Sequence, residues 1–121
     1  MANEITTNLR VQLSNAGLKS DFNPGKILIN QAAQGLFESV RSIATTETSV
    51  ALTGISTPGV AIVWNLDATN YCELGTTTTD YPIRLRPLGL PAIFPLNAGK
   101  TTLYLKANTA ATRVQIIVLE N

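Results

Sequence analysis

The side chains that most often carry catalysis or bind metal ions are nearly absent from this chain. Its 121 residues include no histidine and a single cysteine, Cys72. A Ser-His-Asp or Cys-His nucleophile therefore cannot form within one chain, and a zinc site would lack its usual ligands. We expect Cys72 to be a small buried side chain of the core. These absences predict a protein that is not an enzyme and that needs no metal or cofactor.

Carboxylates are the remaining groups that could do acid–base or metal chemistry. The acidic residues are Glu4, Asp21, Glu38, Glu47, Asp67, Glu73, Asp80 and Glu120. Because none lie close together in strand phase, they do not predict a glycosidase-type pair. Asp67, Asn65 and Asn70 could offer oxygens to calcium, but they hold only one carboxylate, so we predict that Asp67 and Asn70 cap a turn. Leu88-Gly89-Leu90 lacks the lysine that follows a phosphate-binding loop.

The composition is that of a single globular domain with an unusually neutral surface. Hydrophobic residues make up 45% of the chain, charged residues only 14%, and the net charge is +1. Without a basic tract, we expect no direct contact with nucleic acid or with a membrane surface. The first residues do not resemble a signal peptide, and no apolar run approaches the roughly 20 residues of a membrane helix.

The stretch from Val60 to Gly75 is the one around which we expect the other strands to pack. It reads as strand, turn, strand, and it contains the only tryptophan, Trp64. A continuous apolar run bounded by Gly59 and a turn is typical of a strand that is buried on both faces. We therefore predict a hairpin with Trp64 in the core.

Period-two alternation predicts most of the other strands. These cover residues 5–13, 26–30, 49–52, 81–86, 91–96, 101–107 and 111–119. Residues 31–42 include apolar residues at helical spacing but no helix cap, so we favour extended or irregular structure there. Short strands at intervals of about 8 to 12 residues predict an all-β fold, an antiparallel β-sandwich or jelly-roll-like barrel with little or no helix. We expect one domain over residues 1–121, with 1–44 as a possible outer arm and 45–121 as the compact core.

Outward-facing side chains of these strands are the candidates for contact with another protein. Basic and aromatic side chains would form a patch if their strands are neighbours; the alternative is a solvated sheet face. The last strand is apolar in both phases, which places it either at the centre of a sheet or against a partner. The candidate interface residues are Arg84, Arg86, Tyr104, Lys106, Arg113, Ile117 and Leu119.

Three segments of the last two thirds of the chain suggest a family. They are residues 57–71, the pair 83–87 and 91–96, and residues 103–110 with the ending 118–121. In their order and spacing they resemble small virion structural proteins of tailed bacteriophages, of the capsid decoration or cement type. The opening Met1-Ala2-Asn3-Glu4-Ile5 is also typical of such proteins. The chain departs from the family at Leu88-Gly89-Leu90, where relatives more often have a Gly-Glu pair.

The resemblance implies a structural part of a virus particle. We expect a capsid decoration protein, made in the host cytoplasm, that binds the major capsid protein on the outer capsid surface and forms a homo-oligomer. A tail, neck or fibre component is the first alternative. A carbohydrate-binding adhesin module is another, with an exposed Trp64, Tyr71, Tyr81 or Tyr104 as the stacking platform.

Overall fold

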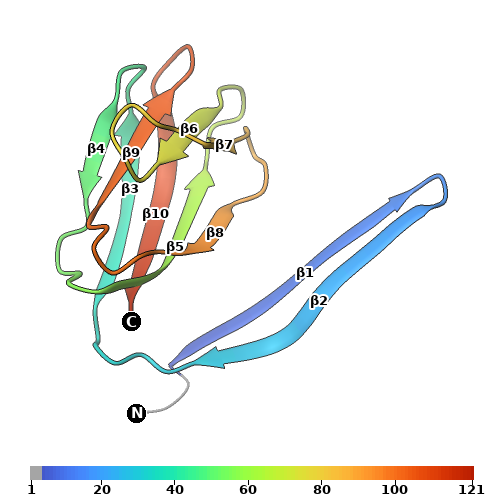
Figure 1. Ribbon diagram of the computed structural model, residues 1–121. Helices are drawn as coiled ribbons and strands as arrows, with labels where there is room; N and C mark the ends of the chain where they lie inside the picture. Colours follow the sequence, from blue (N-terminus) through green and yellow to red (C-terminus); the bar gives the residue numbers. More distant parts are fainter. Residues whose placement is uncertain (1–3) are drawn as a thin grey trace. The chain divides into compact units, whose positions relative to one another are not determined.

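The computed structural model describes residues 4–121, and this part of the chain contains strands and no helix (Figure 1). The strands divide between two compact units, Met1–Ala32 and Ala33–Asn121. They are β1 (Ile5–Asn15), β2 (Leu18–Ile29), β3 (Leu36–Ile43), β4 (Thr48–Ala51), β5 (Pro58–Asn65), β6 (Cys72–Gly75), β7 (Ile83–Leu85), β8 (Ala92–Pro95), β9 (Thr102–Ala107) and β10 (Thr112–Glu120).

The first unit is a two-stranded antiparallel ribbon. β1 and β2 pair from Ile5 opposite Ile29 to Asn15 opposite Leu18. Ala16 and Gly17 connect the strands, both with positive φ, as a two-residue hairpin turn requires. A β-bulge lies within β2 around Pro24, where the register shifts without a reversal of the chain.

The second unit is an antiparallel β-sandwich, as the sequence predicts. One sheet has the order β3-β10-β5-β8 and the other has the order β4-β9-β6-β7. Alternate residues of both sheets point into a shared core, and the sheets do not close into the barrel that was the other expectation. The side chains of this core with the largest volumes and almost no exposure are Ile43, Leu74, Leu85, Leu103, Leu105 and Ile116.

β3 belongs to the sandwich. It pairs with β10 from Ile43 opposite Thr112 to Leu36 opposite Leu119. The boundary between the two units therefore lies at Ala32–Ala33, whereas the sequence suggested a division at residue 44. The alternation of β3 is hard to see in the sequence because its exposed positions also carry apolar residues, Leu36 and Val40.

The predicted hairpin between β5 and β6 does not form. β5 pairs with β10 and β8, whereas β6 pairs with β7 and β9 in the other sheet. The segment between them crosses from one sheet to the other. Asn65, only 1% exposed, fixes the start of this crossing: its Nδ2 donates to the carbonyl oxygens of Asn70 at 2.8 Å and Leu85 at 2.9 Å.

Asp67 caps the crossing segment, as the sequence predicts. Its Oδ1 accepts hydrogen bonds from the backbone N–H groups of Thr69 and Asn70, each at 2.7 Å. These bonds hold the pKa of the Asp67 carboxyl below its usual value. The side chain of Asn70 accepts a further bond from Thr109 Oγ1 at 2.7 Å, which joins this segment to the β9–β10 connection.

Replacement of Asn65 tests whether this crossing holds the two sheets together. Asn65→Ala should lower the free energy of unfolding by about 3 kcal/mol, because it leaves buried carbonyl groups without donors. The exposed Asn97, in the β8–β9 turn, is the matched control, and Asn97→Ala should change stability by less than about 0.5 kcal/mol. Urea denaturation of both variants measures the difference. Equal stabilities would show that the Asn65 hydrogen bonds contribute little.

Candidate functional site

The outer side of the sheet β3-β10-β5-β8 is covered with apolar side chains. Because directly paired residues share a face, three rows run across this sheet. Leu119 lies between Leu36 and Val60, Ile117 lies between Glu38 and Ile62, and Gln115 lies between Val40 and Trp64. β8 extends the first two rows. The apolar sheet face is defined by Leu36, Val40, Val60, Ile62, Trp64, Ile93, Pro95, Ile117 and Leu119.

Several members of the apolar sheet face are strongly exposed. Leu36 is 57% exposed, Ile93 49%, Val40 48% and Trp64 40%. Ile117 and Leu119 lie in the middle of the face and are half-buried; Val118, which separates them in the sequence, is buried in the core. The two apolar phases of β10 thus have different surroundings: one phase fills the core, and the other lies on the outer side of a central strand. Contiguous exposed apolar faces are typical of sites of interaction, so the apolar sheet face is the candidate functional site.

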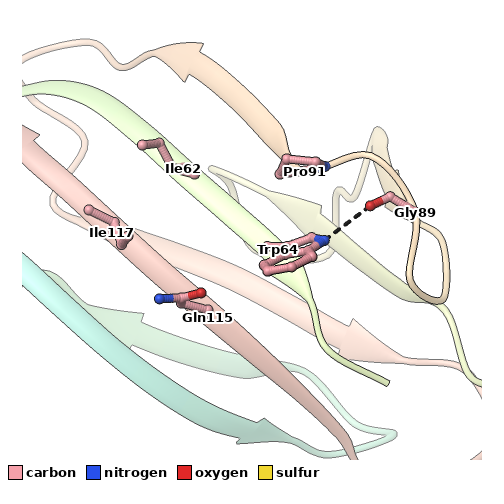
Figure 2. Close-up of a pocket in the computed structure, with 6 residues that line it drawn as sticks. All are labelled: Ile62, Trp64, Gly89, Pro91, Gln115 and Ile117. Atoms are coloured by element: carbon pink, nitrogen blue, oxygen red, sulfur yellow. Dashed lines mark hydrogen bonds between the residues drawn. The ribbon is translucent and has the colours of Figure 1, made fainter. Parts of the chain in front are cut away.

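A hollow of about 200 Å³ lies on the apolar sheet face (Figure 2). Ile62, Trp64, Pro91 and Ile117 form its apolar walls, and Gln115 and Gly89 complete it. The indole Nε1 of Trp64 donates to the carbonyl oxygen of Gly89 at 3.0 Å, which holds the ring across the end of the hollow. The volume is below the roughly 300 Å³ at which small-molecule pockets begin, and it has room for a single large side chain.

The prediction that Trp64 is buried is wrong. In β5 the inward phase belongs to Ala61 and Val63, both fully buried, while Trp64 shares the outward phase with Ile62. The sequence misled because a continuous apolar run is typical of a strand covered on both faces. Here the second sheet covers only one face, and the other is the apolar sheet face.

The predicted interface residues fall on two different surfaces. Arg113, Ile117 and Leu119 have the outward phase of β10, on the side of the apolar sheet face. Arg84, Tyr104 and Lys106 lie in the other sheet, on its outer side. Arg86 follows β7 and is exposed.

The outer side of the second sheet is polar. Glu73 stands between Arg84 and Lys106 in one row, so the positive charges are interrupted by a negative one. The guanidinium of Arg84 lies 4.2 Å from the ring centre of Tyr71, so this arginine makes a cation–π contact within the chain. This side therefore has the character of a solvated sheet face.

Glu120 is a structural carboxylate that the sequence did not single out. It is 5% exposed, and its Oε1 accepts backbone hydrogen bonds from Ser56 at 2.8 Å and Thr57 at 3.0 Å, together with one from the Ser56 hydroxyl. These bonds, first that of the Ser56 hydroxyl, hold the pKa of the Glu120 carboxyl below its ordinary value. Gly35 lies so close to the carboxylate that a β-carbon there would collide with it.

Glu47 binds the polar loop that follows β6. Its carboxylate accepts bonds from the Thr78 hydroxyl and the Thr79 N–H, both at 2.7 Å, and from the Tyr81 hydroxyl. The bond with Tyr81 is the main reason that the pKa of Glu47 is lowered and that the pKa of Tyr81 is raised to about 12. The Glu47 carboxylate is therefore taken up by hydrogen bonds that hold this loop.

Cys72 lies in the core, as the sequence predicts, with no exposed surface. Burial raises the pKa of its thiol to about 11, so the reactive thiolate is scarce at neutral pH. Within residues 4–121, no three acidic or cysteine side chains are grouped so that they could hold a metal ion. The same residues include no helix that is long and apolar enough to cross a membrane.

No family model, curated protein or solved structure matches this chain. The likeness to small phage virion proteins therefore stays a prediction that rests on three segments of the sequence.

The pH dependence of stability tests the role of Glu120. Because its pKa is lower in the folded chain than the ordinary 4.5, ionised Glu120 stabilises the fold above this pH, and the contribution is lost as the pH falls through the folded pKa. Glu120→Gln should therefore unfold more easily than wild type at neutral pH, and the gap should narrow in acid. Urea denaturation of both proteins, from neutral pH down to below pH 4.5, measures the difference in their free energies of unfolding.

Glu38→Gln, which replaces an exposed carboxylate of β3, is the control and should follow wild type throughout. A gap between Glu120→Gln and wild type that stays the same at every pH would contradict the role assigned to the ionised Glu120.

Proposed function

We propose that the chain is a non-enzymatic structural protein of a tailed-bacteriophage particle. In this proposal it is a capsid decoration or cement protein that binds the major capsid protein and stabilises the head. The observation that carries the proposal is the apolar sheet face, which crosses all four strands of one sheet. The sequence resemblance supplies the class of particle, and the surface supplies the means of attachment.

The dimensions of the apolar sheet face support a protein partner. Three strands about eight residues long and the four-residue β8, spaced ~4.8 Å apart at ~3.3 Å per residue, give a footprint of roughly 450 Å². A standard protein interface buries about 800 Å² on each partner, so the face would supply the larger part of one. Glu38 lies in the row of Ile117, and Arg113 lies on the same side of the sheet; these two charges could set the orientation of the partner.

A contact of this kind needs no chemical step. Removal of exposed apolar side chains from water stabilises the bound state at about 25 cal/mol per Å² of apolar surface. The strongly exposed members that would lose contact with water in this way are Leu36, Val40, Ile93 and Trp64. In a particle, the same contact repeats on every copy of the capsid protein, so a modest free energy per site adds to the stability of the shell.

The exposed Trp64 favours one alternative, a carbohydrate-binding module in which the indole stacks on a sugar. Its surroundings argue against this function. Ile62, Pro91 and Ile117 line the hollow beside the ring, and Gln115 is its only polar side chain. Sugar recognition needs several convergent hydrogen-bonding groups, whereas this set suits an apolar side chain. A tail, neck or fibre component would use the same face on a different partner.

Ile117→Asp tests the proposal, because it places a charge at the centre of the apolar sheet face. The variant should lose most of its binding to heads assembled from the major capsid protein of the same genome. The matched control is Tyr104→Asp, at a half-buried outward position in the central strand of the other sheet. This control should bind like wild type. Co-sedimentation with purified heads measures both.

A second variant separates binding from folding. Ile93 is 49% exposed on the edge strand β8, so Ile93→Asp should keep the fold and still weaken head binding. Circular dichroism melting checks the fold of each variant. If folded Ile117→Asp and Ile93→Asp bind heads as well as wild type does, the apolar sheet face is not the attachment surface and the proposal fails.

A further inference from the structure

The ribbon β1–β2 is amphipathic, although it is only two strands wide. Directly opposed residues share a face. The bulge adds one residue to β2 between Phe22 and Gly25, so Gly25, Ile27 and Ile29 lie on the same face as Leu18, Ser20 and Phe22. One face carries the pairs Ile5–Ile29, Thr7–Ile27 and Val11–Phe22. We call this side the ribbon face; its large apolar side chains are Ile5, Leu9, Val11, Leu13, Leu18, Phe22, Ile27 and Ile29.

The opposite side of the ribbon holds its charges. Arg10 pairs with Asp21 there through two hydrogen bonds, at 3.0 and 3.2 Å. Lys19 and Lys26 share this side. The ribbon face itself has no charged residue among its cross-strand pairs, which are apolar except for Thr7, Asn15, Ser20 and Gly25.

Within the described part of the first unit, no other element covers the middle of the ribbon face. Phe22 is 56% exposed and Leu18 67%, and the rest of the face between the ends of the ribbon is 39–50% exposed at its large apolar side chains. A two-stranded hairpin is marginally stable at best in water, and a third strand or a second layer is needed to stabilise it. The sequence nevertheless places a large apolar side chain in every cross-strand pair of this side.

We propose that the ribbon face is a self-association surface, and that it packs face to face on the ribbon face of a second copy of this chain. The result is a four-stranded, two-layered β-structure with a shared apolar interior and the charges of both copies outside. This inference does not depend on the proposed attachment to a capsid, since it concerns different residues in a different unit.

The charge distribution favours an uncharged, apolar partner, and the ribbon face of a second copy is one. An anionic membrane, a nucleic acid or a charged peptide would need countercharges on the ribbon face, and the face has none. Arg10 and Asp21 already neutralise each other on the far side. Two copies of an uncharged apolar face meet without like-charge repulsion, and an isologous contact is the commonest form of assembly.

The area sets the strength of the contact. A ribbon ~37 Å long and ~10 Å wide offers roughly 370 Å² per copy, or about 700 Å² for the pair. This is below the roughly 1,200 Å² of standard interfaces, so the ribbons should form a weak dimer whose population depends on concentration. A larger assembly that holds several copies together would raise the occupancy of the contact.

Sedimentation equilibrium of the full chain, over a concentration series in the micromolar range, tests the proposal. Wild type should show a monomer–dimer equilibrium. Phe22→Asp, at the centre of the ribbon face, should raise the dissociation constant about tenfold or more. The matched control is Asn8→Asp, which lies opposite Lys26 on the charged side and should leave the constant unchanged.

Thiol cross-linking is a second test, and it does not depend on whether Phe22→Asp folds. Val11→Cys, near the middle of β1, should give cross-linked dimers with a short bis-maleimide, whereas Asn8→Cys should not. The native Cys72 has no exposed surface and should not react. A wild type that stays monomeric, or a dimer that Ile117→Asp dissociates and Phe22→Asp does not, would overturn the proposal.

Discussion

β10 lies between β3 and β5 along nearly its whole length, and the alternation of its side chains therefore determines both sides of the sheet. Val114, Ile116 and Val118 are fully buried in the core. Ile117 and Leu119, in the opposite phase, lie in the middle of the apolar sheet face. A shift of one residue in register would exchange the two sets, so the same pairing that builds the core also fixes the outer surface.

Polar groups hold the two ends of this arrangement. Near the start of β10, the carbonyl of Arg113 accepts a bond from Leu66 N–H at 2.9 Å, directly after the buried Asn65. At its end, Glu120 binds Ser56 and Thr57, and the carbonyl of Thr57 accepts the N–H of Asn121 at 2.9 Å. The Glu120 carboxylate thus serves the fold here, and the apolar sheet face is the surface that we propose for contact with a partner.

Sequence patterns predicted the fold class, most strands and the two-sided apolar character of β10, because alternation is a local property. They failed where a residue contacts a part of the chain that is distant in the sequence. The run around Trp64 gave no sign of which side a second sheet would cover, and β5 paired with β10 and not with the neighbouring β6. Glu120 was missed because its hydrogen-bond partner Ser56 is 64 residues away. The division of the chain depended on β3, whose pattern its exposed apolar residues obscured.

Hydroxyl-radical footprinting of the chain, free and bound to heads, tests the central claim most directly. Mass spectrometry would compare the oxidation of Trp64, Leu36 and Ile93 with that of Tyr104 on the other sheet. The apolar sheet face as a contact surface predicts that the first three become protected on binding while Tyr104 stays as reactive as in the free chain. Protection of Tyr104 alone, or unchanged oxidation of Trp64, would contradict it.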